Sequence, residues 1–232
     1  MKRIFIKKAI RFLTLSVAAF TILSCVGVVL YKWINPPITP LMIMRLFEGA
    51  GKIEKNWQNY EDISPNIFKA CIAAEDARFL RHEGIDWKAV EAAKRYNKIY
   101  NGKKIRGAST ITMQTAKNVF LWNGKNFVRK GLEAYFTVLI EAVWGKKRIL
   151  EVYVNVVEWG NGIYGVEAAS QKYFKKSASK LTKREAALLA ATLPNPRRFF
   201  PDKPSKYIKN RADKIQNRMA AIALPRTSSG KK

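Results

Sequence analysis

Two adjacent carboxylates, Glu75 and Asp76, follow a predominantly apolar stretch of the chain. Arg78 stands three residues after Glu75, where it can pair with it across one helical turn, while Asp76 projects to a different side. A glutamate at the edge of a cleft can act as a general base. A solvated acidic helix end is the alternative, and it is the usual fate of such a pair. The residues alone leave both interpretations open.

Small hydroxylated residues between two cations form a second candidate site. The segment that begins at Arg106 and ends at Lys117 contains Gly107, Ser109 and several threonines. Hydroxyl groups, a flexible glycine and flanking cations favour phosphate binding. A polar loop that caps a helix explains the same pattern equally well.

A third candidate site begins with Arg129 and Lys130, which precede a predicted helix that contains Glu133 near its start. The helix dipole stabilises anions at this end, so two cations here are locally unfavourable. Their placement indicates that an external anion binds close by.

Two short motifs point to functions that their context excludes. Residues 160–165 match GxGxxG, but a dinucleotide site also needs alternating strands and helices, so a tight glycine turn is favoured. Ser177 and Lys180 have the SxxK spacing of penicillin-reactive enzymes, without the Lys-Thr-Gly motif that accompanies it. We interpret both as chance matches.

Apolar residues at helical spacing dominate the chain after residue 63 and predict a mainly α fold. Ser64 and Pro65 are typical of an N-cap and a first helical residue, and Thr182 and Glu185 form a capping box. Helices are predicted over residues 64–79, 131–144, 165–174, 182–194 and 205–224. Residues 148–157 are apolar and β-branched, which leaves their element type ambiguous.

An uncharged apolar stretch occupies residues 12–31. A helix of that length rises about 30 Å, which matches the hydrocarbon core of a bilayer. Basic residues precede it, so the positive-inside rule predicts a cytoplasmic N-terminus and an external remainder. A cleaved signal peptide or a lipoprotein signal at Cys25 are the alternatives, but the apolar run continues past that cysteine.

The amino-acid composition predicts that the protein binds an anionic partner. Lys and Arg number 43 against 17 Asp and Glu, a formal charge of +26, which fits a phosphate-bearing substrate, an acidic lipid surface or nucleic acid. A single histidine and the lack of zinc spacing exclude a His-built metal site. Cys25 and Cys71 belong to different parts of the chain, so no disulfide is expected.

The expected organisation is a single globular domain behind an anchor. Pro36 and Pro37 begin a stiff linker after the apolar stretch. The expected segments are a cytoplasmic basic segment (1–11), a transmembrane anchor (12–31), a linker with the start of the extracytoplasmic part (32–63), the domain itself (64–224) and a disordered tail (225–232).

Five motifs in order resemble the peptidoglycan glycosyltransferases, the family of the glycan-polymerising domain of bifunctional penicillin-binding proteins. The matching segments are ED-x-x-F-x-x-H-x-G at 75–84, RGASTIT-x-Q-x-x-KN at 106–118, RK-x-x-E at 129–133, a segment with K-x-x-ILE and GV-x-x-AA at 147–174, and LT-x-x-EAALLA at 181–196. The departures are Ala108, Met113 and Val154, where the family more often has Gly, Gln and Leu. Because the chain ends soon after the fifth motif, the resemblance is to the monofunctional biosynthetic form.

The resemblance implies a lysozyme-like, mainly α glycosyltransferase domain preceded by one transmembrane helix. Such an enzyme joins lipid II units into β-1,4-linked glycan with inversion and releases undecaprenyl pyrophosphate. Glu75 would be the general base and Glu133 the second essential carboxylate. The implied pyrophosphate contacts are Ser109, Gln114, Lys117, Arg129 and Lys130. No cofactor is obligatory, and Glu133 either holds Mg²⁺ or Mn²⁺ or positions the cations.

The resemblance also implies where the enzyme acts and with what. Its partners would be lipid II, the growing lipid-linked chain, an anionic membrane surface and other cell-wall synthesis and division proteins, with no nucleic acid. Its place would be the bacterial inner membrane, with the domain outside, and moenomycin would inhibit it. The expected membrane-facing jaw carries Trp87, Lys94, Arg95, Tyr96, Lys98, Tyr100, Lys103 and Lys104.

Two other functions compete with this interpretation. A lysozyme-like muramidase or lytic transglycosylase would also use a catalytic glutamate. The cations Lys117, Arg129 and Lys130 argue against it, because cleavage of glycan involves no pyrophosphate. A basic nucleic-acid-binding protein is the other rival, and the predicted anchor and the lack of a groove-reading motif argue against that.

Overall fold

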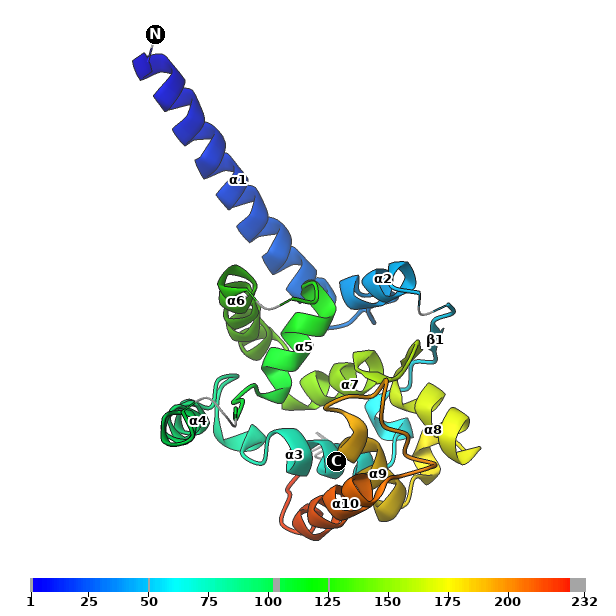
Figure 1. The fold of residues 1–232 in the computed structure, drawn as a ribbon. Coiled ribbons are helices and arrows are strands. Elements are labelled where there is room, and N and C mark those ends of the chain that lie inside the picture. Colours follow the sequence, from blue (N-terminus) through cyan, green and yellow to red (C-terminus); the bar gives the residue numbers. More distant parts are fainter. Residues whose placement is uncertain (1, 50, 102–104, 125, 226–232) are drawn as a thin grey trace, which may run out of the picture.

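The computed structural model describes residues 2–49, 51–101, 105–124 and 126–225, and it confirms the mainly α fold (Figure 1). Its helices are α1 (Lys2–Leu30), α2 (Pro40–Phe47), α3 (Pro65–Glu75), α4 (Trp87–Ile99), α5 (Ile111–Phe120), α6 (Phe127–Val143), α7 (Lys146–Val156), α8 (Val166–Phe174), α9 (Lys183–Thr192) and α10 (Lys206–Met219). Its strands are β1 (Glu54–Lys55), β2 (Glu158–Gly160) and β3 (Ile163–Tyr164). The expected tail from residue 226 onward lies outside the described residues.

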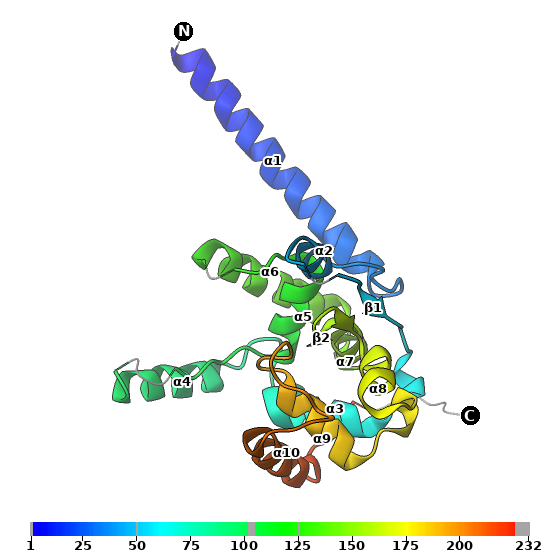
Figure 2. The same ribbon diagram turned by 45° about the vertical axis from the view of Figure 1, so that its right-hand side comes forward.

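Helix α1 is long and apolar enough to cross a membrane, and it projects from the domain in Figures 1 and 2. It begins at Lys2 rather than at residue 12, so the basic segment continues the same helix. Its last turns pack on the domain: Val28 is 1% exposed, and Trp144 donates a hydrogen bond of 2.7 Å to its carbonyl oxygen. The C-terminal end of α1 is therefore packed into the hydrophobic core of the domain.

Helix α2 lies in the segment that the sequence predicted to be a linker. Thr39 caps it by accepting a hydrogen bond from the Met42 amide at 3.3 Å, and Pro40 is its first residue. The same combination of hydroxyl cap and proline predicted the start of α3. Thr39 and Pro40 therefore indicate a helix start in the sequence, but this helix was not predicted.

Helix α3 begins at Pro65 as predicted but ends at Glu75, so the prediction that it continues to residue 79 was wrong. Asp76 leaves the helical conformation, with φ −156° and ψ 67°. Its carboxylate accepts hydrogen bonds from the Ile111 amide at 3.0 Å and from His82 at 2.9 Å. These tertiary contacts end the helix directly after Glu75 and leave that carboxylate on its last turn.

Three other predicted elements have different outcomes. The capping box of Thr182 and Glu185 opens α9 as expected. Helix α6 begins at Phe127, four residues earlier than predicted, because the Asn126 side chain caps it by accepting from the Arg129 amide. The ambiguous residues 148–157 lie almost entirely in α7.

The GxGxxG segment forms a turn between β2 and β3 rather than a phosphate loop. The three strands form one small sheet in the order β1-β3-β2, with β2 antiparallel to β3 and β1 parallel to it. Gly162 has a φ of 72° in the turn, a conformation that favours glycine. The interpretation as a tight glycine turn is confirmed.

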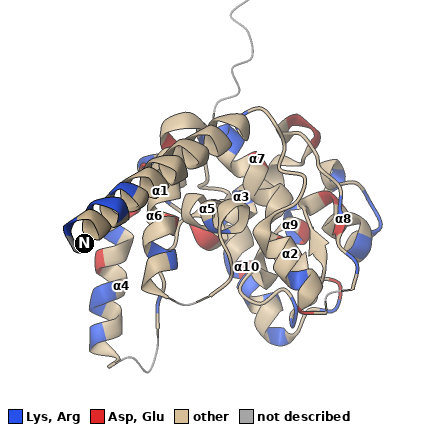
Figure 3. Cartoon of the chain, turned by 90° about the horizontal axis from the view of Figure 1, so that it is seen from above, with Lys and Arg blue, Asp and Glu red and all other residues tan. Residues whose placement is uncertain are grey.

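The helices pack in two groups that meet at α5 (Figures 1 and 2). Helices α3, α9 and α10 pack on one another, while α5 packs on α6 and α7. Helices α2 and α6 lie at the base of α1, and α4 projects sideways (Figures 1 and 2). Figure 3 shows basic residues at the free end of α1 and along α4. The candidate site residues lie on α3, α5 and α6 and on the segment before α5.

Candidate active site

Glu75 is held in place by contacts from two other helices. The Gln114 amide on α5 donates to one carboxylate oxygen at 3.0 Å, and Arg211 on α10 donates to the other at 3.3 Å. The hydroxyl of buried Tyr153 donates in turn to the Gln114 oxygen at 3.3 Å. The expected pair of Glu75 with Arg78 was wrong, because Arg78 forms an ion pair with Asp86 at 3.4 Å.

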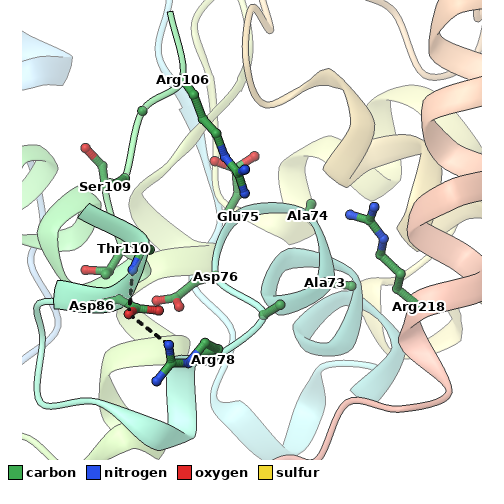
Figure 4. Close-up of a pocket in the computed structure, with 14 residues that line it drawn as sticks. Ala73, Ala74, Glu75, Asp76, Arg78, Asp86, Arg106, Ser109, Thr110 and Arg218 are labelled. Atoms are coloured by element: carbon green, nitrogen blue, oxygen red, sulfur yellow. Dashed lines mark hydrogen bonds and ion pairs between the residues drawn. The ribbon is translucent and has the colours of Figure 1, made fainter. Parts of the chain in front are cut away.

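A cavity of about 260 Å³ opens beside Glu75, and its labelled lining is drawn in Figure 4. The end of α3 forms one wall, and the segment from Arg106 to Thr110 forms another. Arg218 on α10 contributes a further cation to the lining. The side chain of Glu75 is 19% exposed, and Glu75 lines this polar cavity.

The acidic neighbour Asp76 has a structural role. Its contacts with His82 and the Ile111 amide join the end of α3 to the start of α5. Asp76, His82 and Asp86 bring potential ligand atoms within 4.8 Å of one another. However, Asp76 binds the Ile111 amide, and Asp86 binds the Ala89 amide and a guanidinium, so these oxygens already have partners. The cluster positions the two segments on either side of the cavity.

Gly84 packs closely against α6, next to the cluster of Asp76, His82 and Asp86. Its φ is 82°, and a Cβ atom there would lie 2.6 Å from the Thr137 side chain and 2.9 Å from that of Glu141. Thr110, which caps α5, donates from its hydroxyl to the Gly84 carbonyl. Only glycine allows this close approach, which explains the last position of the motif at 75–84.

A cation cluster lies at the start of α6, around the buried carboxylate of Glu133. Arg129 donates to one oxygen of Glu133 at 2.6 Å, and Lys130 forms an ion pair with the other. Arg129 also donates to the Gly124 carbonyl at 2.7 Å. Part of the unfavourable charge at this helix start is therefore balanced from within the helix, in line with the alternative that Glu133 positions the cations.

Lys117 on α5 faces the same cluster. Burial lowers the pKa of its ammonium group; Glu133 opposes this effect, while Arg129 and Lys130 add to it. In the described part of the chain, no hydrogen bond or ion pair involves this ammonium group. Lys117, Arg129 and Lys130 against Glu133 alone leave two net positive charges (three minus one). A partly buried cluster with this excess is suited to an external anion.

Ser109 connects the cavity to the cations. It lines the cavity beside Glu75, and its hydroxyl accepts a hydrogen bond from Lys130 at 3.3 Å. Gln114, expected among the phosphate contacts, binds Glu75 through its amide nitrogen. The structure thus places Ser109, Lys117, Arg129 and Lys130 together and groups Gln114 with the carboxylate.

Three cations near the site were not predicted from the sequence, namely Arg211 and Arg218 on α10 and Arg45 on α2. Arg211 comes from α10, 136 residues after Glu75, and no local pattern links the two. Arg45 comes from α2, pairs with Glu48 and Glu158, and contributes to the lowered pKa of Lys117. The overlooked helix signal at Thr39 and Pro40 was the one feature that points to Arg45.

The segment expected to form a membrane-facing jaw is mostly α4. Trp87, at its start, is 68% exposed, and Lys94, Arg95 and Lys98 lie on the same helix. Lys103 and Lys104 lie outside the described residues. The membrane contact of this segment stays a prediction.

Comparison with known proteins gives consistent matches over almost the whole chain. The model of the Transglycosylase family matches residues 43–220. Proteins called "Biosynthetic peptidoglycan transglycosylase" from Rhodospirillum centenum and Caulobacter vibrioides are 50% and 51% identical, over 94% of this chain and 93% and 94% of their own lengths. One of the same description from Bdellovibrio bacteriovorus is 52% identical over 92% of this chain and 86% of its own length.

Proposed function

The chain belongs to the transglycosylase family and is a glycosyltransferase of peptidoglycan synthesis, and from this premise we propose its substrate and mechanism. The substrate is lipid II, and the product is a β-1,4-linked glycan strand. The 4-hydroxyl oxygen of one lipid-linked disaccharide bonds to the anomeric carbon of the growing chain. The bond from that carbon to undecaprenyl pyrophosphate breaks, with inversion.

Glu75 is the general base in this proposal. It takes the proton of the attacking hydroxyl group, which enters the cavity between α3 and the segment before α5. The contacts of Gln114 and Arg211 support the assignment, because they fix both carboxylate oxygens at the cavity wall. A base held in position contributes roughly 10²–10⁴-fold to such a reaction.

The cation cluster receives the leaving pyrophosphate. The observation that carries this proposal is the partly buried ammonium group of Lys117, which has no anionic partner in the described part of the chain but faces Arg129 and Lys130. Cations fixed where negative charge develops stabilise a transition state more than they would in water. Ser109 lies between this cluster and the cavity of Glu75. The site of the base and the site of the leaving group are therefore adjacent in this proposal.

Glu133 positions the cations in this account. Its two oxygens bind Arg129 and Lys130, and a divalent cation would have to displace them beside a third cation, Lys117. These contacts do not fit a resident Mg²⁺ or Mn²⁺ at Glu133. We therefore propose that no metal is obligatory and that Glu133 acts through the two side chains it holds.

We propose that α1 anchors the protein in the inner membrane with the domain outside. The basic residues before residue 12 support this orientation. Exposed apolar side chains at the base of α1 support it further: Trp33 and Ile34 follow the helix, Phe47 ends α2, and Phe127 is 97% exposed at the start of α6. They suit a surface that rests on the headgroup region.

The direct test is to incubate the purified protein in detergent with lipid II and to separate the products by size. We expect polymeric glycan that lysozyme digests into short fragments. The lytic alternative predicts instead that purified sacculi release anhydro-muropeptides while lipid II stays intact. That pair of results would replace the proposed function.

A further inference from the structure

A stripe of polar side chains runs along one side of α10, and we call it the α10 stripe. Its members are spaced four, three and four residues apart, which places them on one face of the helix: Tyr207, Arg211, Lys214 and Arg218. The adjacent face is buried where α10 packs on α3 and α9, through Ile208, Ala212, Ile215 and Met219. This packing fixes the α10 stripe at the edge of the core.

The α10 stripe connects two hollows in the surface of the domain. Arg218 lines the cavity beside Glu75, and Figure 4 shows its side chain extending from α10 toward the last turn of α3. A second hollow, of about 290 Å³, lies along the same helix. Its lining residues are Tyr207, Asn210, Arg211 and Lys214. Because Arg211 also donates to Glu75 at 3.3 Å, the two hollows adjoin at that carboxylate.

The cations of the α10 stripe have few anionic partners within the protein. Among the described residues, no hydrogen bond or ion pair involves the ammonium group of Lys214 or the guanidinium group of Arg218. The Nε atom of Arg211 is buried and has no hydrogen-bond partner there either. Asp213, the one acidic residue of α10, forms its ion pair with α9. Arg211, Lys214 and Arg218 against Glu75 therefore leave two net positive charges (three minus one).

The position of α10 indicates which part of the substrate supplies the anion. The leaving pyrophosphate is assigned to Lys117, Arg129 and Lys130, a cluster that reaches the cavity through Ser109. Helix α10 lies at the end of the domain opposite to α1, far from the proposed membrane surface (Figures 1 and 2). A phosphate group attached to a membrane lipid stays close to that surface. The anion on α10 therefore belongs to the part of the substrate that points away from the lipid.

The peptide of lipid II has the matching chemistry. It is attached to the sugar next to the one whose 4-hydroxyl group would face Glu75, and it carries free carboxylate groups. Carboxylates form charge-assisted hydrogen bonds with Lys and Arg side chains. Tyr207, which is 59% exposed, adds an aromatic surface to the hollow, and a sugar ring or an apolar peptide side chain packs well on such a surface.

We propose that Lys214 and Arg218 of the α10 stripe bind the peptide carboxylates of the disaccharide whose 4-hydroxyl group attacks. The inference rests on the proposed function and adds the residues that select a substrate with an acidic peptide. Binding of the peptide holds the neighbouring sugar in the cavity, so that its hydroxyl group lies at Glu75. The pyrophosphate of the attacking molecule is the other anion that these cations could meet, and the experiment below separates the two.

The test compares lipid II that carries its acidic peptide with lipid II whose peptide carboxylates are converted to amides. A double variant, Lys214→Gln with Arg218→Gln, removes both cations. Lys209→Gln is the matched control, because Lys209 is exposed on the side of α10 opposite to the stripe. For the acidic substrate we expect the KM of the double variant to rise about fivefold with kcat unchanged, as for partly exposed ion pairs. For the amidated substrate, all three proteins should share one raised KM.

A second measurement uses the unmodified protein and so does not depend on how the variants fold. Lipid II with a photoreactive diazirine on its peptide should crosslink within residues 207–218, as read by mass spectrometry. Crosslinks confined to other segments would overturn the inference, as would an unchanged KM in the double variant. Equal KM increases of the double variant for both substrates would also overturn it and would assign the cations to a pyrophosphate. If the unmodified protein polymerises neither substrate, the proposed function fails, and this inference fails with it.

Discussion

At the scale of single residues, the proposed function gives Glu75 and Lys117 separate roles. Glu75 is fixed by Gln114 and Arg211 and faces a cavity, which is the arrangement that a positioned base requires. Lys117 is partly buried, and among the residues that the structure describes no carboxylate forms an ion pair with it, which is the arrangement that an anion site requires. The two proposed roles thus belong to residues that lie close together around α5.

The charge of Lys117 should set the alkaline limit of activity. Burial lowers its pKa, so the cation is present at low pH and is lost as pH rises through the lowered pKa. Because Arg stays charged, Lys117→Arg should retain activity at high pH relative to its own optimum. The measurement is kcat/KM on lipid II as a function of pH. An alkaline limb that is identical in both proteins would show that another group titrates.

Arg211 should act as a positioning residue for Glu75. Removing the guanidinium in Arg211→Ala frees one carboxylate oxygen, and we expect kcat to fall roughly tenfold with little change in KM. Arg211→Lys should recover part of the loss. Arg184→Ala is the control, because Arg184 pairs with exposed Asp213 on the surface. A rise in KM with an unchanged kcat would place Arg211 in substrate binding.

The sequence predicts the acidic and cationic residues of the site but not how they group. Resemblance assigned Gln114 to the pyrophosphate, whereas its amide binds Glu75. Arg211 was missed because its partner lies 136 residues away, and side-chain spacing predicts only neighbours within a helix. The ion pairs of Glu133 with Arg129 and Lys130 do follow that spacing, so they can be predicted from the sequence.

At the scale of elements, α1 and α6 form one packed unit. Phe20 lies 5.9 Å from Tyr135 between ring centroids, and Ser24 is 2.7 Å from the Tyr135 hydroxyl. Arg148 on α7 donates to the Tyr31 carbonyl at 2.9 Å, just beyond the end of α1. Helix α1 therefore helps to fix the orientation of α6, and with it the cations at the start of that helix.

Breaking one contact of this unit should lower stability. Trp144→Phe removes the donor to the Val28 carbonyl and leaves that buried oxygen without its partner, at a cost of about 1–3 kcal/mol. Trp122→Phe is the control, because Trp122 is 40% exposed. Urea unfolding in detergent measures the difference. Equal free energies of unfolding for the two variants would show that this hydrogen bond does not contribute to stability.

Helix starts were easier to predict than helix ends. Ser64, Thr182 and Ser205 cap their helices as local sequence indicates. The end of α3 depends on Asp76 binding the Ile111 amide, 35 residues away, so no local pattern contains it. The short strands were not predicted, because segments of two or three residues carry too little alternation to detect.

At the scale of the whole molecule, the chain combines one long apolar helix with a strongly basic remainder. The formal charge of +26 suits a protein that works beside anionic lipids on a pyrophosphate substrate. The domain matches a single family over residues 43–220, and its relatives have nearly the same length. Both observations place the described site residues within the part of the chain that the family shares.

Two antibiotics should distinguish this activity from that of a penicillin-reactive enzyme. The Ser177 hydroxyl contacts Ser179 and Glu167. Lys180 meets Ser177 through its backbone amide, which donates to the Ser177 carbonyl at 3.0 Å, and in the described part of the chain no hydrogen bond joins the Lys180 ammonium group to the Ser177 hydroxyl. We therefore expect no covalent labelling by fluorescent penicillin. Moenomycin, which in this family mimics the lipid-pyrophosphate donor, should inhibit polymerisation. Labelling at Ser177, or full activity in saturating moenomycin, would contradict the assignment.

The central claim is that Glu75 drives transfer of each disaccharide with loss of undecaprenyl pyrophosphate. The most direct measurement counts both products, glycan-incorporated disaccharide and released undecaprenyl pyrophosphate, for the unmodified protein and for Glu75→Gln. We predict one released undecaprenyl pyrophosphate for each glycosidic bond formed, which is one fewer than the number of disaccharides in each strand. We also predict a turnover that falls by at least about 10² in the variant, with lipid II still bound. Near-normal turnover in Glu75→Gln, or glycan formed without matching pyrophosphate release, would contradict the account.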